Sequence, residues 1–479
     1  MFLGLTGLLA VRQWLVAAAS FSWSRAAQVS PDRIAPRLAV SQTLTGMTAA
    51  QEILWAAVGG LEAAYLMNPD PYNNSNGSAS LNSAALEEWM AAALDQEAAT
   101  AAPPAATPVE ASDTLTQAVF LPNVVRAWGA PEARALWVTR YDYTDAASIG
   151  TIMTKAAGAN FNIILFQVRA NGDAYYRSGF EPWSARISGT LGQDPGWDPL
   201  AAAVEAAHQM GLELHAYLNV YPAWIGETPP ISGTTPLHMY HALTQTYGND
   251  WLQWDDEGPM TLNTHYLWAS PGHPAITSHI ISVCRDIVNH YAVDGLHLDN
   301  VRYAGAKYSQ DPTSLARYAA ISNTMPYSDW QRLQVTELVS RLYSDVLTGG
   351  LTLSAAVWPY FDAGYNDYYQ DSLGWLNAGE MDAIAPMLYA GAVLTDNAAY
   401  EAQVAFFVQG AAGRQVWAGI TGDYASFEAI ADRIQIARWN GATGQAIFRY
   451  ALIDANDYWD DLRNGPYSAS VAVPEMPWK

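Results

Sequence analysis

Cysteine is almost absent from this sequence. Among 479 residues only Cys284 carries a thiol. A disulfide framework needs paired cysteines, and a cysteine-rich metal site needs several thiolates. Both are therefore excluded, and the redox compartment cannot be inferred from cysteine usage.

Positive charge is also scarce. Lys and Arg together number 23, against 46 Asp and Glu, and lysine occurs only at Lys155, Lys307 and Lys479. The formal charge of −23 makes the average surface repel nucleic-acid phosphates and anionic lipid headgroups. A nucleic-acid-binding function is therefore disfavoured.

No uninterrupted apolar run is long enough for a membrane helix, which needs about 20 residues. Residues 2–11 are apolar, but Arg12 and Gln13 interrupt the run before residues 14–19. No integral membrane span is predicted. The small residues at the end of this segment resemble a signal peptide without its basic start, so we expect a secreted or cell-envelope protein.

The chain divides by composition into an extension, 1–113, and a large domain, 114–479. A helix-like run, 40–67, is followed by segments 68–80 and 101–113, which are rich in Asn, Pro or Ala and lack apolar periodicity. These two segments are predicted linkers. Overall, 50% of the residues are hydrophobic and 14% are charged, which suits a folded core.

From residue 134 onward, strand-like apolar runs alternate with helix patterns, as in repeated βα units. Asp198 and Pro199 form a helix start, and Gly211 ends that helix directly before a strand. No G-x-G-x-x-G turn follows an early strand, which argues against a doubly wound dinucleotide fold. The predicted fold class is α/β, a (β/α)8 TIM barrel with a last helix over 454–462. The predicted strands are 136–139, 162–168, 212–218, 295–298, 351–357, 383–388, 415–420 and 445–449.

Polar side chains stand at or just past the ends of these strands, where barrel enzymes place their chemistry. Alternation puts His297 on the same face as Asp299, and His215 on the same face as Asn219. Either histidine fits a hydrogen-bonded core position or a substrate contact. The polar residues at the strand ends are Arg140, Asp142, Gln167, Arg169, Asp173, Asn219, Asp299, Asn300, Tyr389, Asp423 and Arg449.

Ordered blocks of sequence resemble the glycosyl hydrolase-like 10 family. They are Ile163–Arg169, Asn171–Tyr175, Glu181–Ser184, Asp198–Leu200, Gly211–Tyr217, Val293–Asp299 and Asp382–Tyr389. The resemblance implies a barrel glycoside hydrolase, generally secreted or envelope-associated, in a family that includes enzymes cutting peptide-free peptidoglycan strands. It points to Gln167, Arg169, Asp173, His215, Asn219, His297, Asp299 and Tyr389 as site residues.

Glycoside hydrolysis normally uses two carboxyl groups that flank the scissile bond. Asp299 is expected to be one, and Asp173, which the resemblance covers, is favoured as the other. Asp173 beside Gly172 fits a loop-organising role equally well. The remaining candidates, all in loops after strands, are Asp142, Glu181, Asp362 and Asp423.

A long segment, 220–273, follows the third predicted strand and is rich in aromatic residues, among them Trp224. The faces of such rings stack on sugars, so we expect some of them to form the wall of a substrate cleft. The other rings are expected only to pack the segment. His238 and His241 have a spacing that suits a metal, but no carboxylate motif completes a ligand set. No metal or cofactor is therefore predicted.

Four arginines, Arg140, Arg169, Arg302 and Arg449, fall at or just past strand ends in an otherwise acidic chain. Each either pairs with a neighbouring carboxylate or offers its guanidinium to an acidic sugar. We expect pairing for at least two of them. Arg169 is the predicted contact for a substrate carboxylate, with Arg140, Arg302, Asn300 and Trp224 as further substrate-binding residues.

The predicted function is a glycosidase acting on an oligo- or polysaccharide, with an acidic or envelope glycan as the expected substrate. The family pattern has Asp-Asp where this chain has Asp299-Asn300, which leaves a non-catalytic carbohydrate-binding barrel as the alternative. A metal-dependent barrel hydrolase is disfavoured because no early His-x-His occurs.

Overall fold

The computed structural model describes residues 129–321, 325–347 and 349–479. The predicted extension, 1–113, lies outside the described residues, together with its helix, its linkers and the signal-like segment. Within the described part of the chain, no helix has the length and apolar character to cross a membrane.

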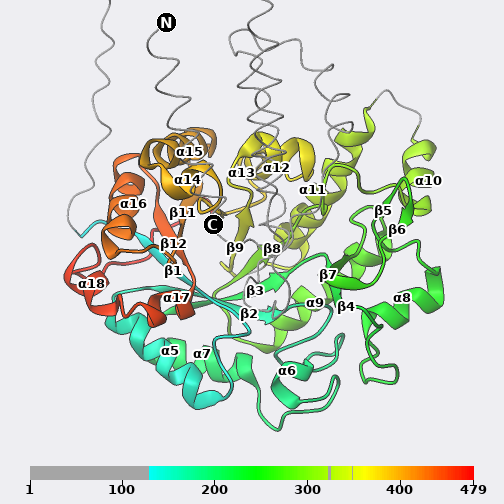
Figure 1. Ribbon diagram of the computed structural model, residues 1–479, viewed down its shortest axis with the longest axis horizontal. Helices are drawn as coiled ribbons and strands as arrows, with labels where there is room; N and C mark the ends of the chain where they lie inside the picture. Colours follow the sequence, from blue (N-terminus) through cyan, green and yellow to red (C-terminus); the bar gives the residue numbers. More distant parts are fainter. Residues whose placement is uncertain (1–128, 322–324, 348) are drawn as a thin grey trace, which may run out of the picture. The chain divides into compact units, whose positions relative to one another are not determined.

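Eight parallel strands close into a barrel in the order β1-β12-β11-β10-β9-β8-β3-β2 (Figure 1). The predicted TIM barrel is therefore confirmed, and each predicted strand overlaps an observed one. The barrel strands are β1 (Ala133–Val138), β2 (Ile163–Arg169), β3 (Glu213–Asn219), β8 (Gly295–Asp299), β9 (Thr352–Val357), β10 (Ala383–Pro386), β11 (Gln415–Thr421) and β12 (Gly444–Phe448).

The barrel strands are buried on both faces, which explains their nearly continuous apolar runs. Closure joins the first and last strands in parallel register, from Ala133 opposite Gly444 to Leu136 opposite Ile447. A side chain at Gly444 would collide with the backbone of Ala133, so closure requires glycine there.

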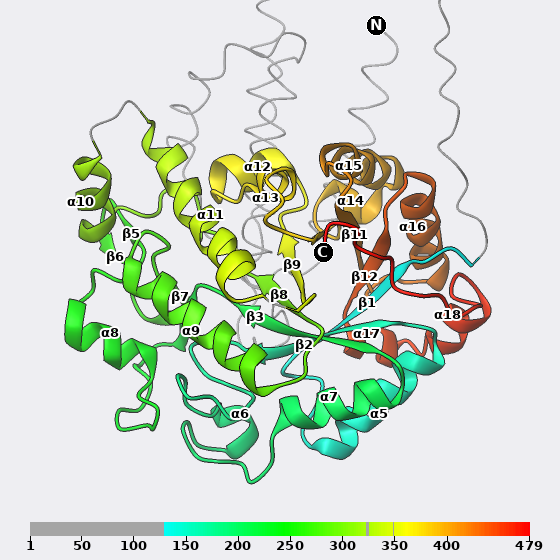
Figure 2. The same ribbon diagram turned by 180° about the vertical axis from the view of Figure 1, so that it is seen from behind.

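Helices surround the barrel (Figures 1 and 2). The predicted helix start at Asp198 is confirmed, because its carboxylate accepts a hydrogen bond from Ala201 N at 3.0 Å. The helices are α5 (Ala146–Gly158), α6 (Ala185–Ser188), α7 (Pro199–Gln209), α8 (Met239–Tyr247), α9 (Pro274–His290), α10 (Pro312–Ala320), α11 (Tyr327–Asp345), α12 (Phe361–Asp367), α13 (Ser372–Asn377), α14 (Ala392–Thr395), α15 (Asn397–Gly410), α16 (Phe427–Trp439), α17 (Tyr450–Ala455) and α18 (Trp459–Asn464).

The predicted last helix, 454–462, is wrong in its bounds. Two short helices, α17 and α18, occupy this region instead. Between them Asp457 adopts a left-handed backbone conformation, with φ of 55°, which a continuous right-handed helix does not permit.

The long segment after β3 is partly ordered into short elements beside the C-terminal end of the barrel. β4 (Pro222–Gly226) pairs antiparallel with β7 (Asn263–Trp268), and β5 (Trp254–Asp255) pairs with β6 (Gly258–Pro259). Helix α8 lies between β4 and β5 in sequence. We call this unit, residues 220–273, the insertion.

The last residues of the chain run across the N-terminal end of the barrel, and we call 467–479 the strap (Figure 2). Its backbone carbonyls accept hydrogen bonds from Glu132 N, at 2.9 Å, and from Gln415 Nε2, at 3.0 Å. Val473 and Met476 pack against the apolar cluster inside the barrel. The strap therefore covers the barrel opening that faces away from the strand C-termini.

Candidate active site

Asp299 is the last residue of β8, at the C-terminal end of the barrel. Its Oδ2 accepts a hydrogen bond from the Tyr217 hydroxyl at 2.8 Å, and its Oδ1 accepts one from Asn300 N at 2.6 Å. Burial raises the pKa of Asp299, although these hydrogen bonds and the charges of Arg302 and Arg140 favour the ionised form. A carboxyl with a raised pKa suits a general acid.

A hydrogen-bonded chain links the ends of β1, β2 and β3. The Arg140 guanidinium donates to Gln167 Oε1 at 3.2 Å, and Gln167 Nε2 donates to Asn219 Oδ1 at 3.3 Å. Arg140 Nη2 also donates to the hydroxyl of Tyr266, in β7, at 3.2 Å. The structure therefore brings three predicted substrate-binding residues together and attaches the insertion to them.

Arg302 lies beside the catalytic candidate in an aromatic surround. Its guanidinium carbon is 5.0 to 5.1 Å from the centres of three aromatic rings, and Nη2 donates to Asn300 Oδ1 at 3.3 Å. Burial lowers the pKa of Arg302. Asn300 takes a left-handed conformation, with φ of 52°, which asparagine tolerates better than most residues. The surrounding rings are those of Trp268, Trp358 and Tyr368.

Aromatic side chains lie beneath this polar layer. Tyr389, predicted as a site residue, stacks on Phe448 with ring centres 5.5 Å apart. Trp137 meets both rings edge-on, at 6.5 and 6.0 Å. Tyr389 and Phe448 are half-buried, whereas Trp137 is buried. The base of the candidate site therefore combines exposed and packed aromatic surface.

His297 is buried in the barrel core, which favours the hydrogen-bonded core position over the substrate contact that stays a prediction. The indole N–H of Trp137 donates to His297 Nε2 at 3.0 Å, and Ser354 Oγ lies 2.9 Å from Nδ1. Because an indole can only donate, Nε2 must accept and the proton sits on Nδ1. Burial lowers the pKa of His297 well below its ordinary value, so the ring is neutral.

His215 is also a buried residue of the barrel core. It lies near the start of β3, opposite Gly295, which places it deep inside the barrel. The ring is fully buried, packs near Trp417 with centres 5.9 Å apart, and has Glu213 Oε2 at 3.2 Å from Nε2. This position and these contacts favour a core role for His215, and a substrate contact stays a prediction.

Arg169, predicted to hold a substrate carboxylate, is fully buried in a structural ion pair. Its Nε and Nη2 donate to the Glu181 carboxylate at 2.8 to 3.0 Å, and Nη1 donates to backbone carbonyls. The pKa of Glu181 is about 2, because these bonds and His279 outweigh the effect of burial. These contacts give both residues a structural role, while a substrate contact for Arg169 and a catalytic role for Glu181 stay predictions.

Asp173 holds its own loop together. Its Oδ1 accepts a hydrogen bond from Asn171 N at 2.8 Å, and the residue is buried. Among the described residues, no hydrogen bond or ion pair joins Asp173 to Asp299. The loop-organising interpretation thus has a direct contact in its favour, and a catalytic role for Asp173 stays a prediction.

The other carboxylate candidates differ in their surroundings. Asp142 Oδ2 accepts hydrogen bonds from Thr139 N and Oγ1 at 2.6 and 2.8 Å, while burial raises the pKa of Asp142. Asp362, on α12, and Asp423, after β11, are both exposed. Asp142 is thus a packed residue at the end of β1, whereas the other two are solvated at the mouth.

The aromatic rings of the insertion differ in burial. Tyr221, Trp251 and Trp268 are buried, so they pack the insertion. Trp224 is half-buried, and its indole N–H donates to Thr228 O at 2.8 Å. The half-buried rings, which keep surface available for a ligand, are those of Trp224, Tyr240, Trp254 and Tyr266.

His238 and His241 are occupied by backbone groups. His238 Nε2 lies 3.1 Å from Asn171 O, and its Nδ1 accepts from Tyr240 N at 3.1 Å. His241 Nε2 lies 2.7 Å from Pro230 O. In the ranges that the structure describes, no cluster of three or more His, Cys, Asp or Glu side chains could hold a metal ion.

Sequence reasoning did not assign roles to Tyr217 and Tyr266, which contact Asp299 and Arg140. Strand alternation already placed Tyr217 on the face of Asn219, so its position was detectable. Tyr266 comes from the insertion, and only the folding of β7 onto β4 brings it to the mouth. No local signal distinguished it from the other rings of that segment.

Known proteins with similar sequences include two bacterial glycosyl hydrolases. The chain is 25% identical to glycosyl hydrolase YngK of Bacillus subtilis over 414 residues, covering 76% of this chain and 77% of that protein. It is 26% identical to glycosyl hydrolase DigH of Escherichia coli over 252 residues, covering 48% of this chain and 54% of that protein.

Among solved structures, the glycoside hydrolase domain of PgaB (BpsB) from Bordetella bronchiseptica matches 72% of this chain and all of that domain, with a TM-score of 0.52. Its sequence identity of 14% supports the fold alone. The sequence profile of one family covers residues 132–416, which include every barrel strand from β1 to β10 and the start of β11. The chain belongs to the glycosyl hydrolase-like 10 family.

Proposed function

We propose that this protein hydrolyses an acidic glycan, with Asp299 as the general acid. The observation that carries the proposal is the setting of Asp299: a strand-end carboxyl with a raised pKa, flanked by arginine charge, at the mouth of a glycosidase-family barrel. Protonation of the leaving oxygen is the step that such a carboxyl performs.

The pairing of the four mouth arginines supports an acidic substrate. Arg169 pairs with Glu181, and Arg449 lies 3.8 Å from the Asp142 carboxylate. In the described ranges, Arg140 and Arg302 form no ion pair with a carboxylate. Two guanidinium charges therefore lie near the candidate acid without direct neutralisation.

A sugar carboxylate offers the missing negative charge, because a guanidinium fork matches its planar geometry. The peptide-free glycan strand of peptidoglycan has this chemistry, since the lactyl group of each muramic acid then ends in a free carboxylate. We therefore propose such a strand as the substrate and Arg140 as its contact. Action outside the cytoplasm, in the cell envelope, follows from this substrate.

Asp173 is the proposed partner carboxylate, because it follows β2 within the family-like block. Its buried hydrogen bond to Asn171 N supports a fixed orientation, which a nucleophile or base requires. The stereochemical outcome depends on whether the two carboxyl groups are about 5 Å apart or roughly 6.5 to 9.5 Å apart.

The test of the function is the substitution Asp299→Asn assayed on a glycan panel, with products identified by mass spectrometry. The intact protein is expected to release fragments from peptide-free peptidoglycan strands, and Asp299→Asn should reduce kcat at least about a hundredfold because the acid is lost. Asp461→Asn, an exposed carboxylate on α18, is the matched control. A fully active Asp299→Asn protein would reject the assignment.

A second function is supported by one observation. Position 300 is an asparagine, and its side chain accepts from Arg302 rather than supplying a carboxylate to the site. A carbohydrate-binding barrel without turnover fits this arrangement. Tight glycan binding by the intact protein, with no product after long incubation, would favour it over hydrolysis.

A further inference from the structure

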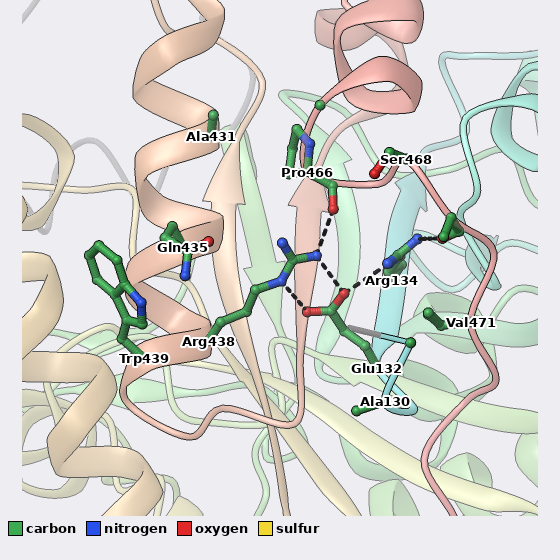
Figure 3. A pocket seen from close by; sticks show the side chains of 13 residues that line it. Ala130, Glu132, Arg134, Ala431, Gln435, Arg438, Trp439, Pro466, Ser468 and Val471 are labelled. Atoms are coloured by element: carbon green, nitrogen blue, oxygen red, sulfur yellow. Dashed lines mark hydrogen bonds and ion pairs between the residues drawn. The ribbon is translucent and has the colours of Figure 1, made fainter. Parts of the chain in front are cut away.

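A separate cavity of about 410 Å³ is seen from close by in Figure 3. Its lining comes from α16 between Ala431 and Trp439, from the residues just before and at the start of β1, and from residues 465–471 after α18. These parts lie at the N-terminal ends of the strands. The cavity is therefore distinct from the candidate active site.

A network of ion pairs lines part of this cavity. The Glu132 carboxylate accepts from Arg438 Nε and Nη2, both at 2.8 Å, from Arg134 Nε at 2.9 Å and from Gln445 Nε2 at 3.0 Å. These partners outweigh burial and lower the pKa of Glu132 to about 2. Two guanidinium groups thus share one carboxylate, which leaves an excess of positive charge in a fixed geometry.

The wall of the cavity carries an exposed indole. Trp439 is 62% exposed, the largest exposed fraction among the large hydrophobic side chains of the described residues. Figure 3 shows it beside Gln435, on the same side of the cavity as Arg438. Because this indole is exposed to solvent at the edge of the cavity, another ring can stack on its face.

Unused hydrogen-bonding groups lie beside this indole. Within the described part of the chain, Arg438 Nη1, the Gln435 amide and the Ser468 hydroxyl have no hydrogen-bond partner. The Gln435 side chain is half-buried, so its amide is partly withdrawn from water. The cavity consequently combines one stacking platform with planar donors and acceptors, the combination that specific small-molecule pockets use.

We propose that this cavity is a second saccharide site, in which a sugar ring stacks on Trp439 and its hydroxyl or carboxylate oxygens bind Gln435 and Arg438. A purely apolar ligand would leave the amide and guanidinium without partners, which costs free energy. The excess positive charge selects a saccharide that bears a carboxylate.

This inference rests on the proposed function, because it gives the second site a role in that activity. One sugar ring cannot occupy both ends of the barrel, so the cavity holds a different part of the polymer or a neighbouring strand. Such a contact raises the effective concentration of substrate at the mouth. It acts on polymeric substrate and has no effect on short soluble fragments.

The test compares Trp439→Ala with Phe406→Ala, which removes another exposed ring, on α15, away from the cavity. The full-length chain is mixed with peptide-free peptidoglycan strands immobilised on beads, and the fraction bound to the sedimented beads is measured. Trp439→Ala should weaken binding roughly tenfold, and Phe406→Ala should leave it unchanged. Kcat/KM on a short soluble fragment of the same glycan should be equal in both variants.

Equal binding of the two variants to the polymer would overturn the second site. So would a Trp439→Ala protein whose melting temperature falls while its binding stays intact, because the indole would then be packed by another part of the chain. Trp439-dependent binding without hydrolysis by any variant would reject the proposed hydrolase activity and retain the saccharide site. Gln435→Ala, which keeps the indole, should give a smaller loss of binding.

Discussion

At the scale of single residues, the hydrogen-bonding partners of the arginine side chains distinguish those that stabilise the fold from those that lie at the candidate site. Arg169 ends the buried strand β2 and Arg140 lies just past β1, yet Arg169 pairs with a carboxylate and Arg140 donates to amide and phenol groups. Only the second arrangement leaves the guanidinium charge available to an anionic ligand. The sequence predicts where these arginines lie relative to the strands, but it does not predict which of them pair with a carboxylate.

Replacing Arg140 by methionine should therefore lower kcat/KM selectively. We expect a loss of about ten- to a hundredfold on an acidic glycan, because a charged hydrogen bond is worth about 1.5–3 kcal/mol. The same glycan with its carboxyl groups reduced should show little change. Arg177→Met, at an exposed arginine, serves as the control. Equal losses on both substrates would contradict a carboxylate contact.

The Tyr217 hydroxyl offers a test based on pH. It donates to Asp299 and so favours the ionised carboxylate; its removal by Tyr217→Phe should raise the pKa of Asp299 further. For a general acid, activity falls as pH rises through this pKa. The alkaline limb of kcat/KM should therefore move to higher pH, by about one unit. A shift to lower pH would contradict the assignment of Asp299 as the acid.

At the scale of elements, the strap is the least expected part of the fold. Trp478 Nε1 donates to Asp382 Oδ1 at 2.7 Å, and Lys479 Nζ lies 3.3 Å from Oδ2 of the same buried carboxylate. Neither contact has a sequence signature, because the residues are almost a hundred positions apart. Val473 and Met476 add apolar contacts inside the barrel opening.

Removing residues 471–479 should destabilise the barrel. The deletion exposes the apolar interior at its N-terminal end and takes two partners from Asp382, so we expect unfolding free energy to fall by about 2–5 kcal/mol. Urea unfolding followed by circular dichroism measures the change. Glu475→Gln, at an exposed strap residue, is the control. An unchanged unfolding midpoint would show that the strap contributes no stability.

The strands were predictable because burial on both faces leaves a plain pattern of apolar runs. The end of each run also located Asp299, Asn219, Gln167 and Arg140 at one rim. Strand position also predicted that His297 lies one layer below Asp299, but it did not predict which side chains the buried ring would contact. The packing of the insertion was likewise hidden, because its pairing partners are distant in sequence.

At the scale of the whole molecule, the described barrel contains its own core from residue 133 onward. Deletion of 1–113 is therefore expected to leave a soluble, cooperatively folding protein, because the proline-rich segment 101–113 precedes the first strand by about 20 residues. Thermal unfolding of the truncated and full-length chains provides the comparison. Aggregation of the truncated chain with loss of its melting transition would contradict this expectation.

Barrel closure has a consequence for synthesis of the chain. β1 pairs with β2 on one side and with β12 on the other. The pairing of Ala133 with Gly444 therefore cannot form until most of the polypeptide has left the ribosome. Until then, the nascent sheet has two open edges whose backbone N–H and C=O groups can pair with other chains. The interval before β12 emerges is thus the period in which this protein is most exposed to aggregation.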